Sequence, residues 1–211
     1  MTILLAAPTC REKDYALDRW NASRRAFFGY GDLPICLVDT TRDDAPPTYA
    51  NFLIDYLSRQ NADYSVRHVD PDWHVICTVS SVSQAWECII SEAHYRNVDY
   101  ILSIEIDVWC PPDTVQTLLG VAEATDAGVV THTYPYPSME HGLHSLGCAL
   151  IDPKMFDKDE KFFGNNCKNF EDLMWDRPNE LGRGIVSISN CLRIEHDNKM
   201  SLEHFDKSGE V

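Results

Sequence analysis

The stretch "YILSIEIDVWCPPDTVQTLL", residues 100–119, reads as a buried strand followed by a helix. Its apolar run, Tyr100–Ile104, stops at two acidic residues, Glu105 and Asp107, which flank a single isoleucine. Two prolines then mark the entry to a helix expected over Thr114–Ala124. A chain that ends a buried strand on two carboxylates needs a physical reason, and the neighbouring pattern suggests one.

Strand-like and helix-like patterns alternate through the first 130 residues. Short apolar runs predict strands at Ile3–Ala7, Ile35–Val38, Tyr64–His68, Tyr100–Ile104 and Gly128–Thr133. Apolar residues at helical spacing predict helices at Thr48–Arg59, Val82–Tyr95 and Thr114–Ala124. This alternation predicts an α/β fold with a mainly parallel central sheet flanked by helices. Ligands of such sheets bind at the carboxyl ends of the strands, where these residues are expected: Pro8, Thr9, Arg11, Asp39, Glu105 and Asp107.

Composition excludes several classes of protein. The net charge of −15 disfavours nucleic acid and anionic membranes as partners. No apolar run approaches the roughly 20 residues of a membrane span. Eight cysteines without a C-x-x-C pair favour a reducing, cytoplasmic location over a secreted disulfide framework. Three arginines lie close together and are interpreted as a solvated helix face: Arg19, Arg24 and Arg25.

The triplet Glu105-Ile106-Asp107 is the strongest chemical feature. Alternation along an extended chain points the two carboxylates to the same side, about 7 Å apart at the backbone. Such a pair suits Mg²⁺ or Mn²⁺, which fills its other positions with water and substrate phosphates. The cation would also bridge an acidic protein to a diphosphate. The alternative is a pair of solvated loop acids. Neither a P-loop nor a G-x-G-x-x-G fingerprint is present.

At these residues the sequence resembles a known family. "VDYILSIEIDVWCPPDTVQTLL", residues 98–119, resembles the metal-binding segment of GT-A fold nucleotide-sugar glycosyltransferases, in which an apolar strand ends in a D-x-D-type motif. Glutamate at the first position leaves Asp107 as the more secure ligand. "LLAAPTCRE" and "CLVDTT" resemble the first two strands with their nucleotide contacts, and "HSLGCALIDPKMF" resembles the acceptor-side strand. "NFEDLMWDRP" is similar to the segment that carries a catalytic carboxylate. The resemblance covers about residues 3–197, and is greatest to N-terminal glycosyltransferase domains of large algal viruses.

The resemblance implies a function and a set of site residues. The donor would be a UDP-sugar such as UDP-glucose or UDP-rhamnose, the cofactor Mn²⁺ or Mg²⁺, and the acceptor a glycan or glycoprotein. The implied nucleotide contacts are Pro8, Thr9, Arg11, Asp39, Glu105 and Ile106. The implied metal ligands are Asp107, Glu105 and His196, and the catalytic carboxylate is Asp172 or Glu171. If the chain is viral, its location is the host cytoplasm.

The same resemblance divides the single domain. Residues 1–110 form a nucleotide-binding half, residues 111–197 an acceptor half, and residues 198–211 a tail or a linker to a further domain. The long loop "YPYPSMEHGLHSLG", residues 134–147, contains aromatic residues that could stack on a sugar. Its histidines and His132 are candidates for acceptor or diphosphate contacts, and the sequence contains no known zinc pattern for them.

Each assignment has a structural alternative. Asp39 could be a loop acid or a helix cap, and His196 a surface histidine. Glu171 and Asp172 could simply favour the start of a helix through its dipole. Two rival functions also stay open. A nucleotidyltransferase would need a phosphate-binding lysine or glycine-rich loop near the first strand, where "APTCREKDY" offers Arg11 and Lys13. A non-catalytic nucleotide- or sugar-binding module would not need Asp107.

Overall fold

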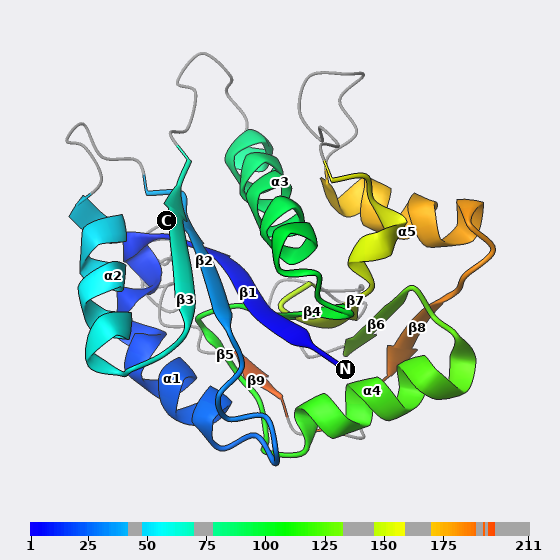
Figure 1. The fold of residues 1–211 in the computed structure, drawn as a ribbon, viewed down its shortest axis with the longest axis horizontal. Helices are drawn as coiled ribbons and strands as arrows, with labels where there is room; N and C mark the ends of the chain where they lie inside the picture. Colours follow the sequence, from blue (N-terminus) through cyan, green and yellow to red (C-terminus); the bar gives the residue numbers. More distant parts are fainter. Residues whose placement is uncertain are drawn as a thin grey trace, which may run out of the picture.

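A computed structural model describes residues 1–41, 48–69, 78–132, 146–158, 170–188, 192 and 194–196. Seven strands form one sheet in the order β3-β2-β1-β4-β7-β6-β8 (Figure 1). Their bounds are β1 Ile3–Thr9, β2 Ile35–Asp39, β3 Tyr64–His68, β4 Tyr100–Ile104, β6 Val129–His132, β7 Cys148–Ile151 and β8 Ile185–Ile188. All pairings are parallel except those of β7, which runs antiparallel to both β4 and β6. The predicted mainly parallel α/β sheet is therefore confirmed.

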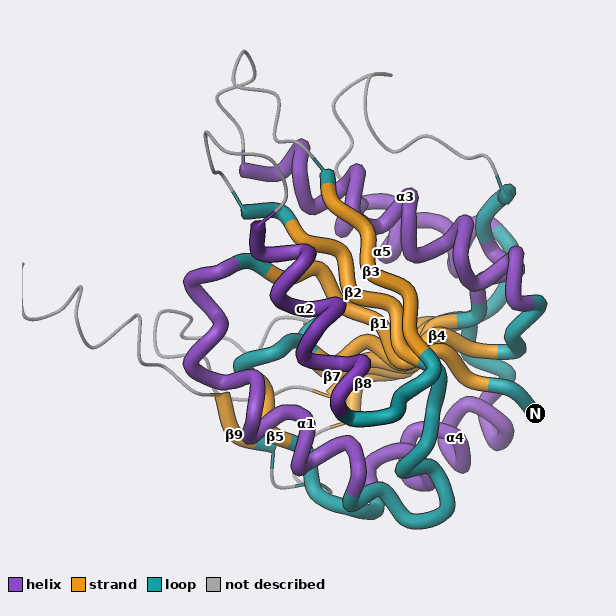
Figure 2. The backbone as a smooth tube through the Cα atoms, turned by 60° about the vertical axis from the view of Figure 1, so that its left-hand side comes forward, coloured by secondary structure: helices purple, strands orange, loops and turns teal. Residues whose placement is uncertain are grey.

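Helices cover both faces of the sheet (Figures 1 and 2). One face packs against α1 Leu17–Arg25, α2 Thr48–Arg59 and α4 Thr114–Thr125, and the other against α3 Thr78–Arg96 and α5 Phe170–Glu180. Strand β1 shows why both faces are apolar. Ile3, Leu5 and Ala7 enter the first core, whereas Leu4 and Ala6 enter the second. A strand buried on both sides needs a continuous apolar run, and "ILLAA" supplies one.

Four short elements complete the description. The 3-10 helices are η1 Arg11–Ala16, directly after β1, and η2 Pro153–Met155. The strands β5 Val108–Trp109 and β9 Glu195–His196 form a separate antiparallel ribbon. No helix in the described ranges is both long enough and apolar enough to cross a bilayer.

The predicted elements lie close to the observed ones. The observed bounds equal the predicted ones for β3 Tyr64–His68, β4 Tyr100–Ile104 and α2 Thr48–Arg59. Helix α3 begins four residues before the expected Val82. The sequence pattern did not predict the helical segment formed by η1 and α1. The interpretation of the three arginines as a solvated face is wrong for Arg24, which is buried beside Trp20 and donates to the Gly31 carbonyl.

Candidate functional site

The carboxyl ends of β1, β2 and β3 bring polar side chains together at one edge of the sheet. Thr9 is the register partner of Asp39, and Asp39 is the register partner of His68. Thr9 and Asp39 are buried, whereas the side chain of His68 keeps 28% of its surface exposed. Thr9, Asp39 and His68 therefore lie together at the carboxyl ends of β1, β2 and β3, and His68 was not among the predicted site residues.

Asp39 organises the loops at this edge. Its Oδ1 accepts hydrogen bonds from the backbone N–H of Thr41 at 2.9 Å and from the Thr41 hydroxyl at 2.5 Å. Its Oδ2 lies 3.0 Å from Nδ1 of His68. The Thr41 hydroxyl oxygen in turn accepts from the backbone N–H of Arg11 at 3.0 Å. A buried carboxylate needs such partners, so a nucleotide base that reached Asp39 would share an oxygen already used within the protein.

The acidic triplet forms a turn and does not continue the extended chain. The backbone N–H of Val108 donates to the Glu105 carbonyl at 2.9 Å, which closes the turn. The side chain of Ile106 is buried in the core, which leaves only its backbone for contact with a ligand. The predicted extended backbone at Glu105-Ile106-Asp107 is therefore wrong. The turn nevertheless brings both side chains to the same place.

The ammonium of Lys13, a residue of η1, lies between the carboxylates of Glu105 and Asp107. Nζ of Lys13 donates to Oε2 of Glu105 at 2.7 Å and to Oδ1 of Asp107 at 2.9 Å. The exposed fractions of the three side chains are 21% for Lys13, 33% for Glu105 and 8% for Asp107. Asp107 is buried, and its carboxylate is paired with the Lys13 ammonium. Lys13 was considered only as a phosphate contact for a rival function, because nothing local in the sequence links it to residue 105.

The electrostatics of the cluster favour a charged lysine. Burial by itself lowers the pKa of Lys13, but the carboxylates of Glu105 and Asp107 outweigh it and raise the pKa above its ordinary value. The neighbouring thiol of Cys10 is different, because burial and the nearby Glu12 raise its pKa to about 12. Cys10 therefore stays protonated at neutral pH and is unsuited to a nucleophilic role.

The two carboxylates fit part of a divalent cation site. Their oxygens converge on one cation, and carboxylate oxygens are the hard ligands that Mg²⁺ and Mn²⁺ prefer. Within the described residues, no group of three or more His, Cys, Asp or Glu side chains is placed to hold a metal. His196 lies in β9 opposite Val108, one residue from Asp107, although its side chain is not described. Water and phosphate would have to supply the remaining positions.

The other predicted site residues take different places. Pro8 is half-buried within β1, and the side chain of Arg11 is exposed. Glu171 and Asp172 lie in the first turn of α5, and their side chains are outside the described part. Residues 134–145 of the long loop lie outside the described residues, and Leu146, near its end, is buried. His132, at the end of β6, is buried.

Comparison with solved structures supports the fold. No protein-family model and no curated protein matches the sequence. Residues 1–349 of S. aureus TarS superpose with a TM-score of 0.60 and 11% identity, over 90% of this chain and 58% of TarS 1–349. The same TarS region has been solved with UDP-GlcNAc. The mannosyltransferase PcManGT of Pyrobaculum calidifontis, solved with GDP-Man and Mn²⁺, gives a TM-score of 0.62 and 10% identity, over 89% of this chain and 55% of PcManGT.

A further solved structure with a similar fold is assigned a different reaction from that of PcManGT. A Bacillus anthracis protein assigned as a glucose-1-phosphate thymidylyltransferase gives a TM-score of 0.56 and 10% identity, over 100% of this chain and 96% of its own. At such identities the matches establish a shared fold, and this chain spans less than two thirds of the TarS and PcManGT chains. None of the three is viral, so they give the algal-virus resemblance no support.

Proposed function

We propose that the chain is a metal-assisted glycosyltransferase that moves a sugar from a UDP-sugar to a glycan hydroxyl. The observation that carries the proposal is the convergence of Glu105 Oε2 and Asp107 Oδ1 on one cation at the edge of a mainly parallel sheet. The superposition on sugar-nucleotide complexes of TarS and PcManGT adds support. Donor binding at this edge follows the general rule for open α/β sheets.

The residues of the cluster have distinct proposed roles. Asp107 and Glu105, with His196 from the adjacent β9, would hold Mn²⁺ or Mg²⁺. When bound, the cation would neutralise the charge of the departing diphosphate. Thr9, Pro8, the Arg11 backbone and the loop organised by Asp39 would position the nucleotide, which fixes the anomeric carbon for attack.

The acceptor side is assigned to the first turn of α5. Asp172 or Glu171 would accept the proton of the attacking hydroxyl in an inverting enzyme, or stabilise positive charge on the sugar in a retaining one. The first helical turn favours a negative side chain through the helix dipole. This assignment rests on the sequence resemblance and on the helical backbone.

The proposal is tested by incubating the protein with UDP-, GDP- and TDP-sugars, each with Mn²⁺ and with EDTA. Release of nucleoside diphosphate that requires Mn²⁺ is the expected result. A screen in which no sugar nucleotide is bound or hydrolysed under either condition contradicts it.

We expect UDP to bind at least about tenfold more tightly than GDP, which is the factor that one hydrogen bond to a charged group contributes. The register partners Thr9 and Asp39 are both buried, so the edge offers limited room for a base and favours a pyrimidine. Calorimetric titration of both nucleotides in the presence of Mn²⁺ measures the ratio. Equal dissociation constants for UDP and GDP contradict the assignment of this edge to a uracil.

A nucleotidyltransferase is the second candidate, and Lys13 is the observation that favours it. A lysine near the first strand is what that function requires, and Lys13 follows β1 and reaches the acidic pair. The two functions differ in their products. A nucleotidyltransferase joins a sugar phosphate to a nucleoside triphosphate and releases pyrophosphate from the triphosphate. A glycosyltransferase releases UDP from a UDP-sugar.

A further inference from the structure

Lys13 and a divalent cation require the same carboxylate oxygens. The Lys13 ammonium contacts Oε2 of Glu105 and Oδ1 of Asp107 at hydrogen-bond distance. A divalent cation bound by those oxygens would stand about 2.0–2.2 Å from them, which is inside the space that the ammonium occupies. Two cations so close would also repel each other strongly. Binding of the metal through this pair therefore requires Lys13 to move.

When Lys13 moves away, the Asp107 carboxylate exchanges one cation for another and is not left without a partner. Its side chain is only 8% exposed, and a buried carboxylate without a cation or sufficient hydrogen bonds is strongly unfavourable. Lys13 and Glu105 are more exposed, at 21% and 33%. The ammonium can therefore leave towards solvent on its flexible stem while Asp107 keeps the incoming metal.

We propose that Lys13 competes with the divalent cation for Glu105 and Asp107, and that a nucleotide diphosphate relieves this competition by accepting the displaced ammonium. The inference rests on the proposed function and deepens it. Lysine is a flexible point charge with three donors that suits phosphate oxygens. Its helix η1 begins at Arg11, whose backbone is tied to the loop that follows β2, on the proposed nucleotide side.

The exchange has a thermodynamic consequence. With Lys13 in place, the cluster of one lysine and two carboxylates has a formal charge of −1, and with a divalent cation in place of the lysine it is neutral. The metal therefore displaces an ammonium whenever it binds, which lowers its apparent affinity. A diphosphate that stabilises the displaced lysine raises that affinity, and by linkage the metal raises the affinity for the nucleotide by the same factor.

The test is titration of Mn²⁺, followed by electron paramagnetic resonance, into the parent, Lys13→Met and Lys154→Met, each with and without UDP. Methionine preserves the unbranched stem and removes the charge. Lys154→Met is the matched control, because that lysine is 68% exposed and pairs only loosely, at 3.9 Å, with Asp99.

We expect Lys13→Met to bind Mn²⁺ about 10- to 100-fold more tightly than the parent without UDP, because two charge-assisted hydrogen bonds no longer oppose the metal. With UDP the difference should shrink. Lys154→Met should stay within about twofold of the parent, since exposed charges are screened.

The outcomes separate this inference from the proposed function. If UDP binding to the parent depends on Mn²⁺ but Lys13→Met binds Mn²⁺ no more tightly without UDP, the competition is overturned and the metal-assisted function stands. If neither the parent nor Lys13→Met binds Mn²⁺, with or without UDP, both are overturned.

A second measurement on the parent protects the test against a variant that does not fold. Lysine labelled with ¹³C at Cε reports on the ammonium group, and the Lys13 signal is assigned by its loss in Lys13→Arg. We expect this signal to shift when Mg²⁺ and UDP are added together. An unchanged Lys13 signal at saturating Mg²⁺ and UDP overturns the inference.

Discussion

Asp107→Asn is expected to remove most of the Mn²⁺-dependent affinity for UDP, by at least about 100-fold. Loss of residues that only support a metal ligand already costs about 10- to 100-fold, and Asp107 is proposed as a ligand itself. The substitution preserves the size of a side chain that is 8% exposed and removes the charge that meets Lys13 at 2.9 Å. Glu105→Gln should have a smaller effect, because Glu105 is more exposed and its position tolerates variation in the family that the sequence resembles.

The measurement is calorimetric titration of UDP into the parent and each variant, with Mn²⁺ and with EDTA. Asp126→Asn is the matched control. It makes the same chemical change on a side chain that is 91% exposed, at a left-handed position that asparagine tolerates well. Parent protein that binds UDP equally well in EDTA contradicts the metal site. The acidic pair would then act only as the partner of Lys13.

The sequence predicts the sheet well because its signals are local and strong. The run "YILSI" is apolar at every position but one and agrees with β4 residue for residue. Helix α1 was missed because its buried face is not apolar. Alongside Leu17 and Trp20 it buries three polar side chains: Asn21, Ser23 and Arg24. A hydrophobic stripe is therefore absent from a helix that packs closely.

The candidate site was predicted only in part, for a different reason. The strand ends identify Asp39, Glu105 and Asp107, since parallel strands align their carboxyl ends. The lysine that joins the acidic pair comes from 92 and 94 residues earlier in the chain. No periodic pattern relates positions so far apart. The turn at Glu105 was also missed, because alternation assumes an extended chain and the buried Ile106 folds the backbone back.

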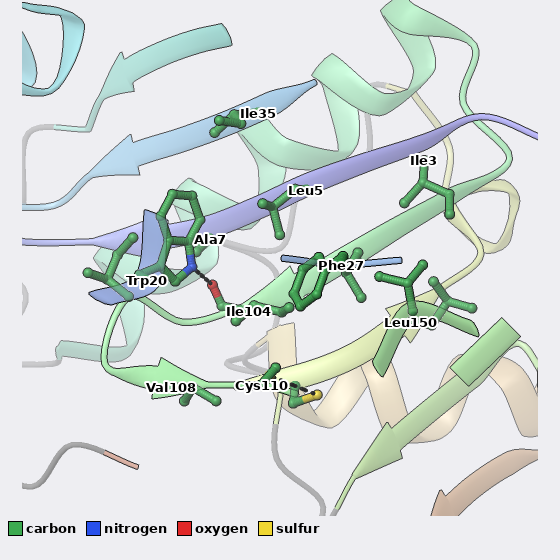
Figure 3. Packing of buried hydrophobic residues seen from close by; sticks show 14 of the residues in the cluster. Ile3, Leu5, Ala7, Trp20, Phe27, Ile35, Ile104, Val108, Cys110 and Leu150 are labelled. Atoms are coloured by element: carbon green, nitrogen blue, oxygen red, sulfur yellow. Dashed lines mark hydrogen bonds between the residues drawn. The ribbon is translucent and has the colours of Figure 1, made fainter. Parts of the chain in front are cut away.

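Trp20 links the core to this turn, and it carries the largest expected effect on stability. The indole N–H of Trp20, on α1, donates to the carbonyl of Ile104 at 3.1 Å, and the side chain is 1% exposed. Figure 3 shows the indole beside β1, with this bond drawn to the end of β4. The carbonyl belongs to the residue immediately before Glu105. The same contact therefore stabilises the core and fixes the start of the acidic turn.

Trp20→Ala is expected to lower the free energy of unfolding by about 3–5 kcal/mol, as for other buried aromatic residues. Tyr95→Ala, which truncates an aromatic side chain that is 83% exposed on α3, should change it by less than about 0.5 kcal/mol. Urea titration followed by circular dichroism measures both values. A decrease in the free energy of unfolding below about 1 kcal/mol in Trp20→Ala contradicts the described packing, because removing a buried indole leaves a cavity that destabilises the protein by more than that.

Trp20→Phe separates the two roles of this side chain. Phenylalanine retains most of the apolar contact but cannot donate to the Ile104 carbonyl, so a loss of about 1–3 kcal/mol is expected. If the indole also holds the acidic turn in position, this variant should bind UDP and Mn²⁺ more weakly than the parent under conditions where both are fully folded. Unchanged affinity in the folded variant would mean that the turn is fixed by its own bonds, from Val108 to Glu105 and from Glu105 to Gly147. The contribution of Trp20 would then be to stability alone.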